Sequence, residues 1–312
     1  MDEDIWAGLS SFQAISFTQR FLKTCYGRLD LKQSEAVSYQ NSYPFLYYLQ
    51  HGKRHYQLAD SAPVELQPLL LFYGMTQLMK ACLLTVDPEY PKTTAVLAHG
   101  VSTRKKKKKN YAFSDDEVRI QKHGLATYFA EKLYHCGRLE GRKFTMDSLL
   151  ERIPDLNDLF REMYGRPPFY RIGIGENGEM EMPAALLDDL HMTQARFIEF
   201  FEKHFHTLVK DSRETQTTLL VRLENIRHPL PSTLDGDLYI SRNRERYDDL
   251  PEMLVHFLLL YNLSMIARYE TEWWSELFHQ AADDLPFIQL FLNITAKKIP
   301  RLTAGYLHSL RK

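Results

Sequence analysis

Two nearly continuous apolar stretches, residues 64–86 and 253–266, dominate the pattern of hydrophobic and polar positions along the chain. The first is long enough to cross a bilayer but carries several polar and charged side chains. The second is shorter than the roughly 20 residues that a membrane helix needs. Helices that are apolar on nearly all sides are typical of the interior of large folds. We therefore expect two buried core helices and no membrane partner.

The first 90 residues have a helical pattern that is rich in aromatic side chains. Pro88 and Pro91 should end the helix that contains the first apolar stretch, because proline lacks a backbone donor and disfavours helix in the residue before it. Residues 114–117 have the serine-to-acid spacing of a capping box, and residues 144–150 also open a helix. This part of the chain is thus predicted to be helical.

The pattern changes in the middle of the chain, where side chains alternate in polarity around Asn177-Gly178 and predict a β-hairpin. Residues 217–223 and 237–240 are two more β-prone segments, and residues 188–209 favour one long helix. We expect a mainly α (α+β) fold, a multi-helix protein with a small antiparallel β insert in the middle of the chain. The predicted regions are an N-terminal helical region at 1–165 with a basic loop at 99–123, a β-containing middle with one long helix at 166–245, and C-terminal helices at 246–312 that pack on the N-terminal region.

Composition narrows the class of protein. With 312 residues, 44% of them hydrophobic, the chain can bury a sizeable core. The 39 cations and 40 anions nearly cancel, so affinity for a polyanion must come from local clustering. Three cysteines without a CxxC pair argue against a disulfide framework and a zinc ribbon. Because the acidic N-terminal segment also lacks the order of a secretory signal, we expect a cytoplasmic protein.

The strongest local feature is a basic run that follows a histidine-glycine turn. Eight cations and three anions lie between Arg104 and Lys122. Such a cluster attracts phosphates through counterion release, although a solvated loop of mutually repelling charges is the simpler interpretation. The hydroxyl and imidazole groups that precede the run could orient a phosphate better than lysines alone. The candidate binding residues here are His99, Ser102, Thr103, Arg104, Lys105, Lys106, Lys107, Lys108 and Lys109.

Two polar stripes add to these candidates. Tyr73, Thr76, Gln77 and Lys80 recur at helical spacing on the first apolar stretch, and Tyr261, Ser264 and Arg268 do so on the second. The simplest interpretation is that each stripe faces water. If the first helix is instead buried all round, Lys80 needs a partner or a ligand, because an unpaired buried charge is very costly. Facing stripes with His99 at the rim would form a pocket for an anionic small molecule, so Lys80 and Arg268 join the candidates.

Four segments carry a family resemblance: residues 68–84, 97–105, 116–118 and 263–270. They resemble the YaaC-like proteins of Bacillus and its relatives, and the resemblance extends over essentially the full chain. It implies a bacterial, cytoplasmic protein. The resemblance implies no reaction, because the family has no assigned activity.

Catalytic motifs are weaker. Arg222 and His228 match the arginine-to-histidine spacing of HEPN-type ribonucleases, which are helical and metal-independent. In those proteins the motif lies on a helix, whereas here it follows a β-prone run and stops at Pro229. A histidine could act as acid or base if a substrate came within hydrogen-bond reach. The pairs His51/His55 and His204/His206 lack a complete set of ligands on one side, so we expect no metal.

No phosphate-binding loop, dinucleotide fingerprint or nucleophile elbow is present, so we expect no cofactor and no standard nucleotide hydrolysis. The leading hypothesis is a binding or regulatory protein that engages a phosphate-bearing ligand, a nucleic acid or nucleotide, through the 99–109 loop. One alternative is an HEPN-like ribonuclease that uses Arg222 and His228. Another is a scaffold whose aromatic pair Trp273-Trp274 binds a protein partner or a second copy of the chain.

Overall fold

The computed structural model describes residues 6–29, 31, 33–104, 112–175, 177–224, 229–248, 250–280 and 282–311, and the chain divides into two compact units. We call Met1–Leu149 with Leu250–Lys312 the helical unit, and Leu150–Asp249 the middle unit. Helices predominate and are accompanied by small antiparallel sheets. The predicted fold class is confirmed.

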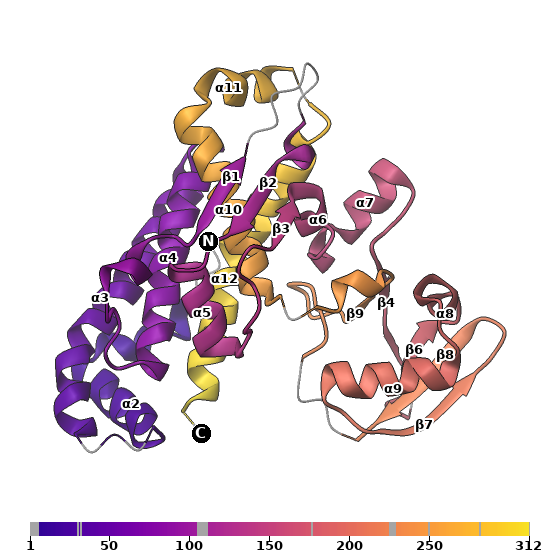
Figure 1. The fold of residues 1–312 in the computed structure, drawn as a ribbon, viewed down its shortest axis with the longest axis horizontal. Coiled ribbons are helices and arrows are strands. Elements are labelled where there is room, and N and C mark those ends of the chain that lie inside the picture. The colour runs from indigo at the N-terminus through magenta and orange to yellow at the C-terminus, as the bar shows by residue number, and fades with distance from the viewer. Residues whose placement is uncertain are drawn as a thin grey trace. The chain divides into compact units, whose positions relative to one another are not determined.

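The helical unit is built on the helices predicted for the first 90 residues and on those of the C-terminal part (Figure 1). Its first long apolar helix ends at Val86, directly before Asp87-Pro88, as the proline pattern predicts. The helices of this unit are α2 (Ile15–Gly27), α3 (Ser34–Ser61), α4 (Gln67–Val86), α5 (Leu125–Tyr134), α6 (Met146–Leu150), α10 (Glu252–Tyr269), α11 (Thr271–His279) and α12 (Leu285–Ser309).

Helix α4 is the centre of the core. It packs against α2, α3, α5, α10 and α12, and its Phe72 and Leu78 are fully buried. On the facing side, Phe257 of α10 packs against Phe72 with 5.3 Å between ring centroids. Within the described part of the chain, α4 is also the one helix long and apolar enough to cross a membrane, and most of it is buried inside the unit. Its apolar character is accounted for by this packing.

A buried ion pair joins α10 to α12. Lys298 is 3% exposed, and its Nζ lies 2.6 Å from Oε1 of Glu252. One turn along α10, the fully buried His256 shares a 2.7 Å hydrogen bond between its Nδ1 and Oγ1 of Thr295. Burial and the nearby charge of Lys298 hold the pKa of His256 well below its ordinary value. The imidazole is therefore neutral in the folded protein at neutral pH.

The helical unit also contains a three-stranded antiparallel sheet, which the sequence interpretation missed. Its order is β1 (Val101–Arg104), β2 (Glu117–Ile120), β3 (Lys143–Thr145), and β1 packs on α10. The helix predicted from the capping-box spacing at 114–117 is wrong. Val118 and Ile120 are fully buried and alternate with the exposed Arg119, so the period is two and the segment is a strand. The helix predicted to open at residues 144–150 is α6, which begins at Met146, after β3.

The middle unit carries two further antiparallel sheets around a core of aromatic and aliphatic side chains. One sheet pairs β4 with β9, and the other has the order β5-β6-β8-β7. The elements of this unit are α7 (Asn157–Tyr164), β4 (Phe169–Arg171), β5 (Gly173–Ile174), β6 (Met180–Pro183), α8 (Ala185–Leu190), α9 (Gln194–Phe205), β7 (Val209–Glu214), β8 (Thr218–Leu223) and β9 (Tyr239–Ser241).

The predicted hairpin around Asn177-Gly178 is confirmed as β5 and β6, and the two other predicted β segments become β8 and β9. The single helix predicted for residues 188–209 is wrong. His191 adopts the left-handed region with φ of 53° and ends α8, and the hydroxyl of Thr193 then caps α9. The last residue of the predicted helix, Val209, begins strand β7.

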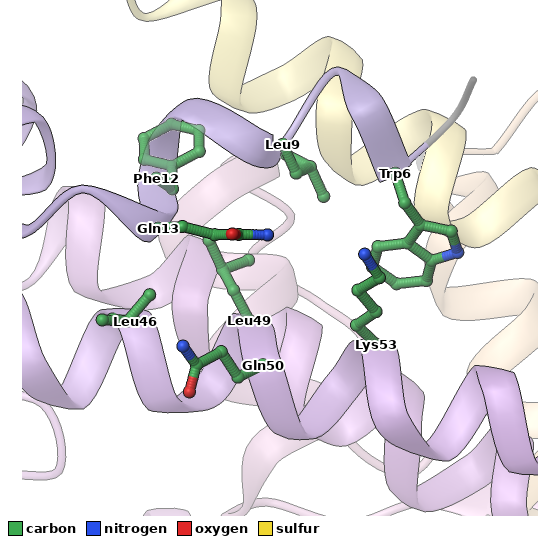
Figure 2. Close-up of a pocket in the computed structure, with 8 residues that line it drawn as sticks. All are labelled: Trp6, Leu9, Phe12, Gln13, Leu46, Leu49, Gln50 and Lys53. Carbon is green, nitrogen blue, oxygen red and sulfur yellow. The ribbon is translucent and has the colours of Figure 1, made fainter. Parts of the chain in front are cut away.

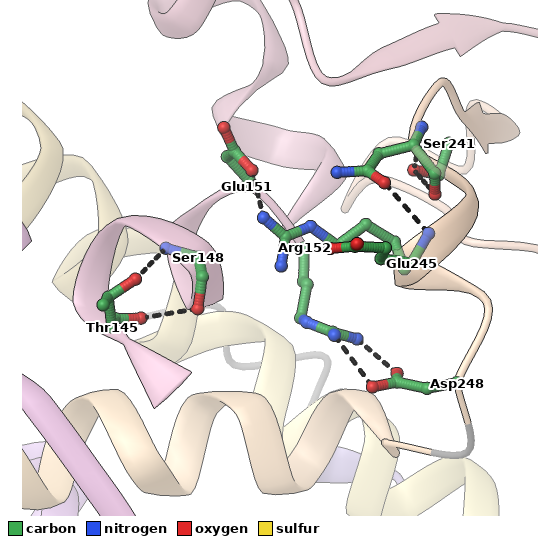
Figure 3. Close-up of polar contacts among 9 residues, drawn as sticks. Thr145, Ser148, Glu151, Arg152, Ser241, Glu245 and Asp248 are labelled. Carbon is green, nitrogen blue, oxygen red and sulfur yellow. Dashed lines mark hydrogen bonds and ion pairs between the residues drawn. The ribbon is translucent and has the colours of Figure 1, made fainter. Parts of the chain in front are cut away.

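Ion pairs join the first and last residues of the middle unit (Figure 3). Arg152 donates from both terminal nitrogens to the two oxygens of Asp248, at 2.6 and 2.9 Å. Its neighbour Glu151 pairs with Arg246. The guanidinium of Arg152 is mostly buried, with 8% of its side chain exposed, so the bidentate geometry counts for more than an ordinary surface pair. We call these four residues the clasp.

Candidate functional site

Three basic side chains from different parts of the sequence come within electrostatic reach of one another in the helical unit. They are Lys80 on α4, His99 in the segment before β1, and Arg268 in the last turn of α10. The charges of Arg268 and Lys80, after burial, are what lower the pKa of His99. We call these three residues the cation cluster.

The backbone around His99 is fixed by a pair of glycines. Carbonyl oxygens of Ala98 and His99 accept hydrogen bonds from the first amides of α5, Leu125 N at 2.7 Å and Ala126 N at 3.1 Å. Gly100 has φ of 76° and Gly124 has φ of 131°, and a Cβ on Gly100 would lie 3.0 Å from Cα of Gly124. Only glycine tolerates both the conformation and the close approach. The histidine-glycine turn seen in the sequence is therefore a docking point for α5.

The imidazole of His99 lies against two aromatic rings. Its centroid is 4.9 Å from that of Phe72 on α4 and 5.8 Å from that of Tyr261 on α10. Phe72 and Tyr261 are themselves 5.7 Å apart, so the three rings form one contact group. Burial raises the pKa of Tyr261, and the charge of Arg268 counteracts this in part. His99 is half-buried, and its imidazole packs against these two rings.

Arg268 joins the two polar stripes directly. Its Nη1 donates to the hydroxyl of Tyr73 at 3.1 Å, and its Nε donates to the carbonyl of Ser264 at 3.1 Å. The guanidinium carbon lies 6.0 Å from the ring centroid of Tyr73 and 5.3 Å from that of Tyr269. Cation–π contacts of this kind hold an arginine in place without neutralising it.

Lys80 is half-buried, and its Nζ lies 5.8 Å from the ring centroid of Tyr48 on α3. Burial lowers the pKa of this lysine. The aromatic face is the partner that the sequence interpretation required for a buried Lys80, and it leaves the positive charge uncompensated. Tyr48 was not among the candidates, because the register between α3 and α4 that brings the two together is a tertiary property.

Within the described ranges, no carboxylate pairs with Lys80, His99 or Arg268. Each partner found for them is a neutral ring, hydroxyl, carbonyl or thioether. A carboxylate within about 6 Å would raise the pKa of His99, whereas two cations lower it. The cluster is thus a local concentration of positive charge.

A family model for YaaC-like proteins matches residues 10–307. The chain belongs to the YaaC-like family. The resemblance predicted from the four sequence segments is confirmed, and the match includes both units. No curated protein and no solved structure matches the chain.

The remaining predicted binding residues lie on or next to β1. Ser102 accepts a 2.6 Å hydrogen bond at its Oγ from Nε2 of Gln121, and Thr103 is half-buried. Arg104 is exposed at the end of the strand, opposite Glu117 in register. Lys105 to Lys109 lie outside the described residues. Of the polar stripes, Thr76 and Ser264 are buried and hydrogen-bonded to carbonyls of their own helices, so they are not ligand donors.

The described segment that follows the basic run is fixed to the C-terminal helices. Phe113 is fully buried, and its amide donates to Oδ2 of Asp284 at 2.6 Å. Asp116 accepts from Nδ2 of Asn262 on α10 at 3.2 Å through its Oδ2. Burial raises the pKa of Asp284, and bonds from Phe113 and Ser114 oppose that shift. The basic run in this YaaC-like chain therefore connects two anchored points, β1 and residues 113–116.

The ribonuclease candidates belong to the middle unit. Arg222 lies on strand β8, not on a helix, and its Nη2 pairs with Oε1 of Glu179 at 2.6 Å. His228 lies outside the described residues. With the charge of Arg222 already engaged across the sheet, the geometry of this YaaC-like chain offers no argument for the nuclease hypothesis.

The tryptophans differ from each other. Trp274 is 3% exposed, and its Nε1 donates to the carbonyl of Glu65 at 3.0 Å, so it belongs to the core. Trp273 is half-buried. Larger exposed aromatic surface lies elsewhere, on α3, where Tyr39, Tyr43 and Tyr47 are spaced one turn apart and point to solvent. The aromatic pair that motivated the scaffold hypothesis thus provides only one accessible ring.

A pocket lies between the N-terminal segment and α3 (Figure 2). Apolar side chains form most of its lining, and Lys53 contributes the one cation. None of the predicted binding residues lines it. Its lining residues are Trp6, Leu9, Phe12, Gln13, Leu46, Leu49, Gln50 and Lys53. An apolar pocket with one lysine suits a phosphate less well than the cation cluster does.

Proposed function

We propose that this YaaC-like chain is a binding protein for a phosphate-bearing ligand, a nucleotide or nucleic acid, which is held at the cation cluster. The observation that carries the proposal is the grouping of Lys80, His99 and Arg268 without a carboxylate among the described residues. Convergent cations repel one another, and no carboxylate among the described residues compensates that repulsion. A bound anion would compensate it, and charge-assisted hydrogen bonds to a phosphate are among the strongest available.

The placement of the basic run supports the same proposal. β1 begins two residues after His99 and carries the chain directly into Lys105–Lys109. The run follows β1 in the sequence, and we expect its like charges to raise the local concentration of an anionic ligand through their field. In this proposal the cluster provides the specific contacts and the run provides attraction.

The test is a calorimetric titration of the purified chain with inorganic pyrophosphate. Replacing two cluster residues, Lys80→Gln with Arg268→Gln, should weaken binding at least about tenfold, since a hydrogen bond to a charged group contributes about 1.5–3 kcal/mol. The matched control removes two exposed cations of the middle unit, Arg196→Gln with Lys203→Gln, and should bind as the parent does. Equal binding by all three proteins, or no binding by the parent, would overturn the proposal.

The role of the run is tested separately. Replacing Lys105 to Lys109 with glutamine should weaken binding to a single-stranded RNA and flatten its dependence on salt, because each neutralised phosphate contributes to that slope. Unchanged retention of the variant on RNA at every salt concentration would remove the run from the proposal. The cluster would then stand alone.

A further inference from the structure

The cation cluster is extended along α4, and its dimensions point to a particular anion. Arg268 bonds to the hydroxyl of Tyr73, and Lys80 follows Tyr73 by seven residues on the same helix. Seven residues correspond to about 10 Å of helix axis. His99 contacts Phe72 and is acted on by both charges, so it belongs to the same row. A row of this length suits a chain of phosphates better than a single phosphate.

One end of the row carries an aromatic platform. Tyr269 is 68% exposed, and its ring lies 5.3 Å from the guanidinium carbon of Arg268. Its phenol also acts electrostatically on Tyr261, whose ring contacts His99. The partly exposed ring of Tyr73 also lies near Arg268, with 6.0 Å between the guanidinium carbon and the ring centroid. Exposed aromatic rings beside an arginine are surfaces on which nucleobases stack.

The opposite end of the row has a different character. Lys80 is held over the half-buried ring of Tyr48, and no other aromatic ring of the described residues lies over its Nζ. A lysine acts on phosphate as a point charge with three rotatable donors, without the planar fork of arginine. The two ends of the row therefore differ: one has exposed aromatic rings beside Arg268, and the other has the ammonium group of Lys80.

Resting on the proposed function, we propose that the ligand is a free nucleoside polyphosphate, with its base on Tyr269 and its phosphates running past His99 toward Lys80. The base and the phosphate chain are then recognised by different residues, Tyr269 at the end of α10 and Lys80 on α4. A nucleic acid would share the nucleotide chemistry but would continue beyond a row of this length.

The experiment measures binding of four probes to the parent chain: adenosine triphosphate, adenosine monophosphate, inorganic tripolyphosphate and a single-stranded oligonucleotide. Tyr269→Ala should weaken binding of the triphosphate nucleotide by about tenfold, within the range reported for loss of one stacked base, and leave tripolyphosphate unchanged. Tyr269→Phe should bind like the parent. Tyr39→Ala, which removes an equally exposed tyrosine of α3, is the control.

Lys80→Gln tests the other end. It should weaken the triphosphate by about tenfold and leave the monophosphate unchanged, because only the longer phosphate chain reaches the lysine. Circular dichroism of each variant verifies that the fold is intact.

Three outcomes would overturn the inference, and they are distinguishable. If adenosine triphosphate and tripolyphosphate bind the parent equally, the base is not recognised, while the proposed anion site stands. If the oligonucleotide binds and the triphosphate does not compete with it, the ligand is nucleic acid. If none of the probes, including inorganic pyrophosphate, binds the parent, the proposed function fails and the inference fails with it.

Discussion

The helical unit contains two groups in which a lysine lies near a histidine: the buried ion pair and the cation cluster. Only in the first is the lysine's charge neutralised by a carboxylate. In the buried ion pair, Lys298 is 3% exposed and has a carboxylate oxygen at 2.6 Å, beside the buried His256. In the cation cluster, Lys80 is half-buried and has an aromatic ring as its partner, beside the half-buried His99. A fully buried lysine cannot remain charged without an opposite charge beside it, whereas a lysine that is partly exposed to water can remain charged and bind an anionic ligand. The comparison separates charge used for folding from charge available for binding.

Replacing each of the two lysines should give the largest difference between the groups, measured as the free energy of unfolding. Lys298→Met should lower the free energy of unfolding by about 3–5 kcal/mol, because it leaves Glu252 without its cation in a partly buried site. Lys80→Met should change it by less than about 0.5 kcal/mol, since no carboxylate of the described residues pairs with that charge. Urea denaturation measures both.

A control separates the lost pair from lost packing. Removing both charges, Glu252→Leu with Lys298→Met, should recover much of the loss, because an apolar pair of similar volume is often as stable as a buried ion pair. Similar losses for Lys298→Met and Lys80→Met would contradict the distinction between the two groups.

The next effect concerns the support of His99. Gly124→Ala should lower the free energy of unfolding by about 1–3 kcal/mol, because alanine must adopt a positive φ and its Cβ meets the backbone of Gly100. It should also weaken pyrophosphate binding by displacing His99. Gly137→Ala is the matched control, because no atom lies within 4 Å of the added Cβ. A stable Gly124→Ala protein with parental binding would show that the glycine pair does not position the site.

Acid should destabilise the protein through His256. Its pKa in the folded state is well below 6.5, through burial and then Lys298, so the unfolded chain binds more protons as pH falls. The stability that the neutral imidazole contributes is complete above about pH 6.5 and is lost below it, by about 1 kcal/mol between pH 7.5 and 5.5. Urea denaturation at the two pH values measures the loss. A His256→Gln variant should show a correspondingly smaller pH dependence, and an unchanged one would refute the assignment.

The smallest effect is a pH dependence of anion binding at His99. Burial, Arg268 and Lys80 lower the pKa of His99 in the free protein, and a bound anion favours the protonated imidazole. Binding of sulfate, whose charge is constant in this range, should therefore strengthen about threefold as pH falls from 7.5 to 5.5. Calorimetric titration measures it, and His99→Asn should make the affinity independent of pH. A parent whose sulfate affinity does not change with pH would exclude His99 from the site.

The parts of the molecule that can be predicted from the sequence are those with a local signal. The apolar stretch of α4 and Pro88 were sufficient for a core helix and its end, and Asn177-Gly178 was sufficient for a hairpin, because these are local signals. Strand β2 was missed, because the capping-box spacing at 114–117 competed with a period-two pattern only four residues long. The break at His191 was missed because a non-glycine residue in the left-handed region is uncommon, and no glycine or proline marks this position in the sequence.

For the candidate site, the limits have another cause. Lys80, His99 and Arg268 were visible as residues whose types suit an anion, but Tyr48 and Tyr269 were not. The role of Tyr48 depends on how α3 packs on α4, and a side-chain contact across two helices leaves no spacing in the sequence. Tyr269 is the sequence neighbour of Arg268, but its exposure is a property of the fold. Ser102 was visible as a hydroxyl donor, yet its bond from Gln121 depends on the pairing of β1 with β2.

The clasp lies where the middle unit is inserted into the sequence of the helical unit. Because Arg152 and Asp248 are in direct contact, the two points at which the chain enters and leaves the middle unit lie within a few residues' reach of each other. A hundred-residue insertion with adjoining ends disturbs its host no more than a surface loop does. We therefore expect that a short glycine-serine linker can replace residues 153–247. The helical unit, with its cation cluster, would then be encoded by two segments that a single turn reconnects.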